Sequence, residues 1–167
     1  MTSAHGSTTP EQACIHWCYL FNRNSQDLLR KAALGANQEK RLETVNTLLK
    51  EFNRANHHNT TVPPLHIANL TQDDWAELHG PLYKSAICRH AATFSLQLAE
   101  QFYTEPDAYS EGVLQANRSL CRIYDVLYAS GVFLNHAQLA DLTDAVLNLG
   151  AAFHMPRSIC QERGDLY

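Results

Sequence analysis

The sequence has no excess of positive charge, no long apolar run and no signal-peptide pattern. Its 13 Lys and Arg are outnumbered by 17 Asp and Glu, for a formal net charge of -4. This balance excludes a globally basic nucleic-acid-binding protein, although it permits a local basic groove. The apolar runs are too short to cross a bilayer, and MTSAHGSTTPEQ at the start lacks basic and apolar regions. We therefore expect a cytosolic protein without a membrane contact.

Motifs of catalysis and metal binding are also lacking. No Gly-rich phosphate loop, nucleophile elbow or metalloprotease helix occurs, so we expect no enzyme and no cofactor. Five cysteines at irregular spacing indicate reduced, buried thiols rather than disulfides. Cys14, His16 and Cys18 have ligand chemistry, but on a helix His16 would point away from the two cysteines. We therefore predict no metal site.

What the sequence does contain is apolar periodicity of the helical kind, with no strand-like alternation over a useful length. This pattern predicts an all-α, single-domain bundle of six or seven helices. We expect a flexible arm over residues 1–9, a core domain over 10–156 and a polar tail over 157–167. The first expected helix starts at Pro10. The next four cover Gln26–Leu34, about Asn37–Ala55, Thr71–His79 and Leu82–Tyr103. A further helix is capped by Asp107 or Ser110 and ends at Ser130-Gly131, and the last runs from Asn135 to Pro156.

Helical spacing also predicts which side chains are buried. The expected inner faces are Leu42, Val45, Leu48, Leu49 and Phe52; then Ile87, Ala91, Phe94, Leu98 and Phe102; then Val113, Leu120, Ile123, Leu127 and Tyr128; and last Leu139, Leu142, Val146, Leu149 and Phe153. Between the first two of these helices, Asn56 to Leu70 contains Pro63-Pro64 and is expected to be an extended loop. Gly35 is expected to end the helix over Gln26–Leu34.

Five polar residues are candidates for a binding site: Lys84, Arg89, Arg118, Arg122 and Asp125. Arg118 and Arg122 lie one helical turn apart, and Asp125 follows three residues after Arg122. One interpretation is a solvated face with an ion pair between Arg122 and Asp125. The other is a groove in which the arginines bind phosphate oxygens and the carboxylate orients an arginine or accepts a hydrogen bond from a base or ribose.

Three runs carry a resemblance to a known family. Ile87-Cys88-Arg89-His90, Glu105-Pro106-Asp107-Ala108-Tyr109 and Ser119-Leu120-Cys121-Arg122-Ile123-Tyr124-Asp125-Val126-Leu127-Tyr128 are similar in order and spacing to the core of coat proteins of flexible filamentous plant viruses, of the potyvirus and potexvirus types. The resemblance covers about residues 82–150. Shorter runs, Thr8-Thr9-Pro10-Glu11-Gln12 and Ala33-Leu34-Gly35, resemble coat proteins of rigid-rod viruses.

The resemblance implies an RNA pocket. Asp125 matches the acidic residue of the family's pocket, the family's basic residue on the preceding helix falls near Lys84 or Arg89, and its hydroxyl residue near Thr60 or Thr61. Arg118 and Arg122 would be supporting cations. These residues imply a coat or nucleocapsid protein that self-associates into a helical polymer on single-stranded RNA, in the virion and host cytoplasm.

A polymer needs only a few cations per subunit, because weak sites sum along the strand. The alternative is an all-α adaptor that binds another protein through exposed faces around Trp17 and Trp75, without nucleic acid.

Overall fold

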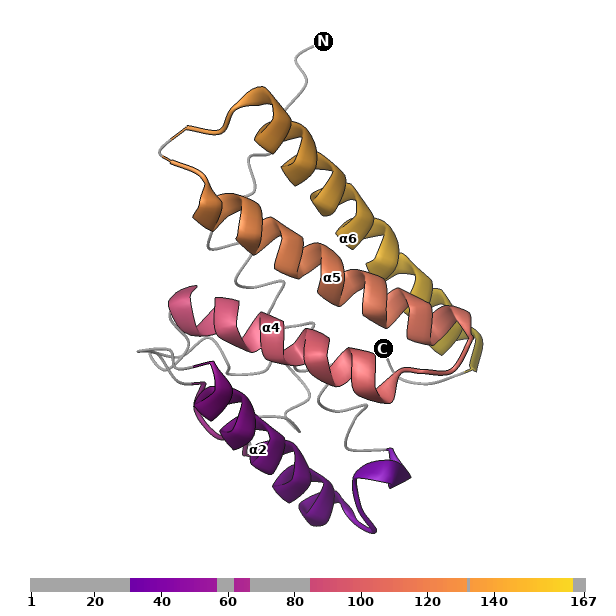
Figure 1. The fold of residues 1–167 in the computed structure, drawn as a ribbon. Coiled ribbons are helices and arrows are strands. Elements are labelled where there is room, and N and C mark those ends of the chain that lie inside the picture. The colour runs from indigo at the N-terminus through magenta and orange to yellow at the C-terminus, as the bar shows by residue number, and fades with distance from the viewer. Residues whose placement is uncertain (1–30, 57–61, 67–84, 132, 164–167) are drawn as a thin grey trace. The chain divides into compact units, whose positions relative to one another are not determined.

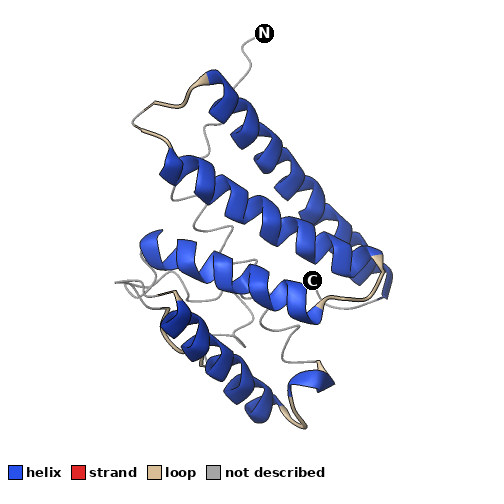
Figure 2. Cartoon of the chain, in the orientation of Figure 1, coloured by secondary structure: helices blue, strands red, loops and turns tan. Residues whose placement is uncertain are grey.

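The computed structural model describes residues 31–56, 62–66, 85–131 and 133–163, with the side chains of 85, 86 and 153–163 left aside (Figure 1). Within these ranges the regular structure is four α-helices and one 3-10 turn, and no strand occurs (Figure 2). The all-α class is therefore confirmed for this part of the chain. The predicted arm over 1–9, the helix from Pro10 and the helix over 71–79 lie outside it.

The chain divides into two compact units, residues 1–90 and 91–167. The first contains the turn η1 (Ala32–Leu34), the helix α2 (Gln38–Ala55), an extended segment over 62–66 and the start of α4 (Ser85–Phe102). The second contains the rest of α4, α5 (Ala108–Ala129) and α6 (His136–Arg163). None of the described helices combines the length and apolar character that crossing a membrane requires.

Helix α2 forms where the sequence predicts it. The side chain of Asn37 accepts a hydrogen bond of 2.9 Å from the backbone N–H of Lys40, which satisfies one of the amides that a helix start leaves open. Val45, Leu49 and Phe52 are buried, as expected from their spacing. Leu42 and Leu48, at the edges of the same face, are half-buried. The spacing of the apolar residues therefore predicted both the helix and the face that is buried.

The helix predicted over Gln26–Leu34 is wrong at its described end. Lys31 has extended backbone angles, φ -73° and ψ 117°, and only the 3-10 turn η1 follows. Side chains from α2 hold this turn, because the Thr44 hydroxyl donates to the Leu34 carbonyl at 2.8 Å and Arg41 Nε donates to the Gly35 carbonyl at 2.8 Å. Gly35 does end the turn, and its φ of 152° is one that side-chain-bearing residues rarely adopt.

Two asparagines of α2 hold the extended segment 62–66 through paired hydrogen bonds. Asn53 accepts from the Val62 N–H at 3.2 Å and donates to the Val62 carbonyl at 3.0 Å. Asn46 makes the same pair with Leu65, at 2.8 and 2.9 Å. Seven helical residues rise about 10 Å, and three residues in polyproline geometry span about 9 Å, so the two pairs are in register. The predicted extended loop is thus confirmed for 62–66.

In the second unit, α5 begins at the predicted cap. The carboxylate of Asp107 accepts from the backbone N–H groups of Tyr109 and Ser110 at 2.9 and 3.0 Å. The helix ends at Ser130, as predicted, where the Ser130 hydroxyl donates to the Val126 carbonyl. Its inner residues are buried and include Val113, Leu120 and Ile123. Leu127 and Tyr128 were expected on this inner face and are exposed, whereas Val126 in the same turn is buried.

A buried polar contact links α4 to α5. The Ser95 hydroxyl donates to Asn117 Oδ1 at 2.7 Å, and Asn117 Nδ2 donates to the Val113 carbonyl at 2.8 Å. Asn117 is 1% exposed, so both ends of its amide need these partners. Because an amide bonds only at a defined distance and angle, this contact fixes the register of the two helices.

Helix α6 departs from prediction in two ways. It continues through Pro156 to Arg163, although proline was expected to end it. Proline removes one backbone hydrogen bond and usually kinks a helix, but turns on both sides can hold it. Its buried residues are Ala145, Leu149 and Ala152, whereas Leu139, predicted on the inner face, is 51% exposed. Helix α6 is apolar around most of its circumference, so spacing alone does not identify the side that packs on α5.

Candidate nucleic-acid interface on α5

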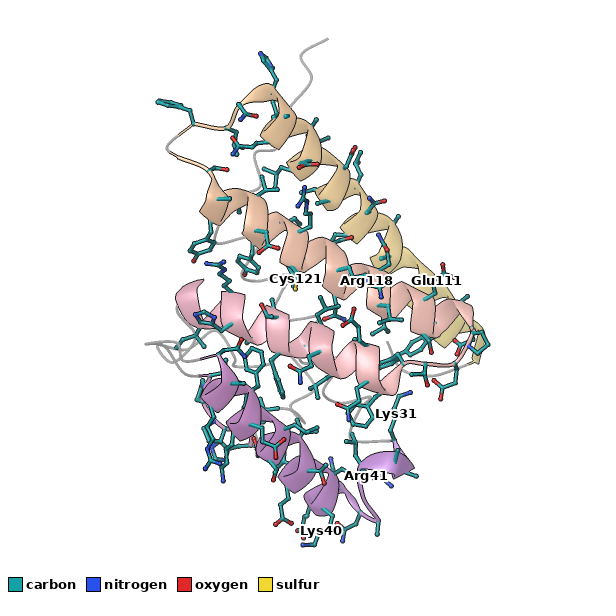
Figure 3. The ribbon with its side chains drawn as sticks, viewed as in Figure 1. Lys31, Lys40, Arg41, Glu111, Arg118 and Cys121 are labelled. Carbon is teal, nitrogen blue, oxygen red and sulfur yellow. The ribbon has the colours of Figure 1, made fainter. Side chains whose placement is uncertain are left out.

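The solvent side of α5 carries a row of polar residues that we call the α5 ridge. Its members are exposed and recur at alternating spacings of four and three residues: Glu111, Gln115, Arg118, Arg122 and Asp125. This spacing follows one side of an α-helix. Figure 3 shows Glu111, Arg118 and Cys121 along α5. Three residues predicted for the site, Arg118, Arg122 and Asp125, therefore share one surface.

Both arginines of the ridge are ion-paired with carboxylates from neighbouring helices. Arg118 lies 3.4 Å from Glu100 of α4, and Arg122 lies 2.5 Å from Asp141 of α6. All four side chains are at least half exposed, and such pairs typically contribute about 0.2–1 kcal/mol. One sequence-based interpretation paired Arg122 with Asp125. That interpretation is wrong, because Arg122 forms its ion pair with Asp141 of α6 instead.

The thiol of Cys121 lies beside the ridge in an acidic environment. Burial raises its pKa to about 12, and the negative charges of Asp125 and Glu100 contribute to the increase. Among the described residues, Cys121 is a free thiol that forms no disulfide. A thiol with a raised pKa stays protonated at neutral pH and is a poor nucleophile and metal ligand. Cys121 therefore acts here as an apolar packing residue.

The structure does not test whether the other predicted site residues belong with the ridge. Lys84 and Thr61 lie outside the described residues. Arg89 is half-buried on α4 and belongs to the first unit, which ends at His90, whereas the ridge belongs to the second. The predicted pairing of Arg89 or Lys84 with Asp125 remains a prediction.

Acidic residues dominate the described side chains of the second unit. Its basic residues over 91–131 and 133–152 are Arg118 and Arg122; its acidic residues there are Glu100, Glu105, Asp107, Glu111, Asp125, Asp141 and Asp144. A phosphate that approaches the ridge must therefore replace a carboxylate at an arginine and tolerate others nearby. Within the described ranges, no three His, Cys, Asp or Glu side chains gather into a group that could hold a metal ion.

Several large apolar side chains of the second unit are exposed. Phe133, between α5 and α6, is 88% exposed, and Leu139 and Leu147 on α6 are 51% and 66% exposed. Sequence analysis did not identify these residues as a surface, because leucine at helical spacing predicts burial. It also missed Glu100 and Asp141 as partners of the arginines. Each lies about twenty residues from its partner, and no local pattern encodes such a pair.

Comparison of the chain with known protein families, with curated proteins and with solved structures found no match. The α5 ridge and the exposed apolar residues are therefore the features of the chain that bear on its function.

Proposed function

We propose that this protein is a coat or nucleocapsid subunit that assembles into a helical polymer and packages single-stranded RNA, in a virion and in the cytoplasm of a host. The observation that carries the proposal is the α5 ridge, on which Arg118, Arg122 and Asp125 are exposed in a single row. A row along one helix is suited to a nucleic-acid backbone, which presents charge at regular intervals. The proposal includes a core domain over 10–156 with six or seven helices, and a role without catalysis or cofactor.

The ion pairs determine how the ridge would bind RNA. Arginine forms two parallel hydrogen bonds to phosphate as readily as to carboxylate, and the exposed pairs with Glu100 and Asp141 are weak enough to exchange. Asp125 would accept hydrogen bonds from ribose hydroxyls or base N–H groups. Arg89, Lys84 and Thr61 are the other residues that the sequence analysis assigns to RNA binding, and their part in it stays a prediction. Because many subunits bind one strand, weak binding by each subunit suffices.

The primary experiment examines the purified protein by negative-stain electron microscopy and by its ratio of absorbance at 260 and 280 nm. A coat protein forms filaments or rings that carry RNA, and RNase treatment lowers the absorbance ratio. Monodisperse protein without nucleic acid, also after incubation with single-stranded RNA, would contradict the proposal.

Substitutions on the ridge then test the site. Arg122→Ala should weaken binding of a fluorescent oligoribonucleotide and reduce the salt slope of binding by about 0.7 for each lost phosphate contact. Asp141→Asn should strengthen binding, because it frees the same arginine. Helical circular dichroism should be unchanged in both variants. Asp144→Asn, an exposed carboxylate off the ridge, is the control for a general loss of negative charge.

The second candidate function is an all-α adaptor that binds another protein without nucleic acid. The excess of acidic side chains in the second unit and the exposure of Phe133, Leu139 and Leu147 favour it. In that case neither Arg122→Ala nor Asp141→Asn changes RNA retention, and the purified protein stays free of nucleic acid.

A further inference from the structure

Helix α2 holds the segment 62–66 through main-chain hydrogen bonds of the kind that bind extended peptides. Asn53 bonds both main-chain groups of Val62, accepting from its N–H at 3.2 Å and donating to its carbonyl at 3.0 Å. Asn46 does the same for Leu65, at 2.8 and 2.9 Å. An asparagine amide has an acceptor side and a donor side, so each amide satisfies one residue of an extended chain. In the described part of the chain, the segment makes no other hydrogen bond.

The two bonded residues of the segment are also its apolar anchors. Val62 and Leu65 are each 2% exposed. Between them, Pro63 is half-buried and Pro64 is exposed. Prolines favour the polyproline helix, which has three residues per turn, so residues three apart lie on the same side. The segment therefore presents its anchors and its bonded main-chain groups at the same two positions.

The two prolines occupy the positions at which α2 uses no N–H group. Proline has no N–H to donate, and the donors that reach α2 are those of Val62 and Leu65. Proline also fixes φ, which lowers the entropy that an extended segment loses when it binds. The bound segment thus defines a class of ligand, which is an uncharged extended peptide with two apolar residues three apart and prolines between them.

The binding groups on α2 come from this one helix. Asn46 and Asn53 are seven residues apart, which is nearly two turns, so they lie on one side of α2 about 10 Å apart. Leu49 lies between them along the helix and is buried. Because the asparagines bond main-chain groups, their contacts do not depend on which side chains separate the two anchors. None of these contacts requires that the ligand belong to the same chain as α2.

We propose that α2 is a binding site for extended, proline-containing segments of a partner protein, of the form apolar-Pro-Pro-apolar, and that residues 62–66 are a built-in ligand that competes with them. A tethered ligand has an effective concentration on the order of mM. A partner therefore displaces it by offering a longer or repeated segment. The proposal goes beyond RNA packaging and does not depend on it, because the α5 ridge belongs to the other unit.

A partner protein suits this site better than a second copy of the chain. Exchange of segments between two copies replaces each contact by an identical one, so it gains no bond and loses the freedom of two separate molecules. A partner segment that continues beyond the two anchors gains contacts that the built-in ligand does not make. The occupant is therefore a foreign segment with the chemistry of residues 62–66.

The test empties the site in the full chain and supplies the ligand as a peptide. Val62→Asp combined with Leu65→Asp places charges at buried positions, which releases the built-in ligand. The probe is a peptide with the sequence Val-Pro-Pro-Leu-His, acetylated at one end and amidated at the other. NMR of the side-chain amides of Asn46 and Asn53 follows binding, because these signals respond to hydrogen bonding. Both signals should leave their wild-type positions in the released variant and return toward them as the probe is added.

Matched variants identify the groups that bind. Wild type should bind the probe about tenfold more weakly than the released variant, or weaker still, because the tethered segment competes. In the released variant, Asn53→Ala should weaken binding about tenfold, whereas Thr47→Ala, at an exposed position of the same helix, should leave it unchanged. A probe with N-methyl-leucine lacks the N–H that Asn46 accepts and should also bind about tenfold more weakly.

Three results would overturn the inference. The first is a folded released variant whose asparagine signals do not respond to the probe. The second is equal binding with and without Asn53→Ala. The third is dimers of wild type with the released variant at concentrations too low for the probe to bind, which would make a second copy the occupant. If the released variant loses helical circular dichroism, Val62→Ser with Leu65→Ser takes its place, and the probe should then raise its melting temperature; an unchanged melting temperature would contradict the proposal.

Discussion

Helices α2 and α6 show two ways in which apolar residues are used in this protein. Helix α2 has one apolar stripe and a charged opposite side, and the stripe is the side that is buried. Helix α6 is apolar on both sides and buries mainly small residues, Ala145 and Ala152 with Leu149, while Leu139 and Leu147 face solvent. The difference shows that apolar periodicity identifies a buried face only where the other side is polar.

The largest expected effect contrasts a leucine from each helix. Leu49→Ala should reduce the free energy of unfolding by about 2–5 kcal/mol, because it leaves a cavity in a packed core. Leu139→Ala should change it by less than about 0.5 kcal/mol, because the side chain is exposed in the isolated subunit. Urea denaturation of dilute protein measures both. Equal losses for the two variants would mean that Leu139 is covered within one copy.

A smaller loss in the free energy of unfolding is expected when an asparagine of α2 that holds the extended segment 62–66 is replaced. Asn53→Ala removes both bonds to Val62 and leaves a partly buried N–H and carbonyl without the side-chain amide, for a loss of about 1–3 kcal/mol. Thr47→Ala, at an exposed position of the same helix, should have little effect. Hydrogen exchange of the Val62 amide should accelerate in the first variant alone; an unchanged rate would show that Asn53 does not hold the segment.

Cys121 on α5, the helix that packs on α6, should make the free energy of unfolding depend on pH in the alkaline range. The folded-state pKa of Cys121 is raised from 9.0 to about 12, so the unfolded chain loses this proton first. The stabilisation is therefore complete below about pH 9 and declines as the pH rises toward about 12. Because the side chain is only half-buried, solvent should screen part of the effect. Thermal melts of wild type and Cys121→Ala between pH 8 and 11 measure it, and parallel pH profiles would contradict the assignment.

The smallest effect concerns Gly150 on α6. Gly150→Ala should stabilise the isolated subunit by about 0.5–1 kcal/mol, since alanine is the better helix former and its methyl group meets open space. Thermal denaturation of dilute protein measures the gain. The matched control is Ala151→Gly, which should destabilise the same helix by a similar amount. A loss of stability in Gly150→Ala would show that the position is packed within one copy.

How far the sequence predicted the fold depended on how local each signal was. Asp107 was recognisable as a cap, and the buried face of α2 followed from its spacing, because these features depend on residues within one or two turns. The end of α6 was mispredicted, because the helix continues through Pro156 to Arg163 although proline removes one backbone hydrogen bond. Leu127 and Tyr128 were also mispredicted, because helical spacing placed them on the buried face and both are exposed.

The candidate site shows a similar division. Helical spacing alone grouped Arg118, Arg122 and Asp125 on one side of α5, and the structure bears this out. The partners of the arginines were not predictable, because Glu100 and Asp141 come from other helices. Their presence changes the chemistry of the site, since each guanidinium already binds a carboxylate.

The sequence by itself determined the all-helical class of the described part, most of the helix starts and the buried face of α2. Those features depend on backbone hydrogen bonds and side-chain spacing within a few turns. Only the tertiary structure decided the partners of the ridge arginines, the hydrogen bonds from α2 that hold residues 62–66, and the side of α6 that faces solvent. These depend on contacts between residues far apart in the chain, and which of several apolar faces is buried is set by the neighbour it meets.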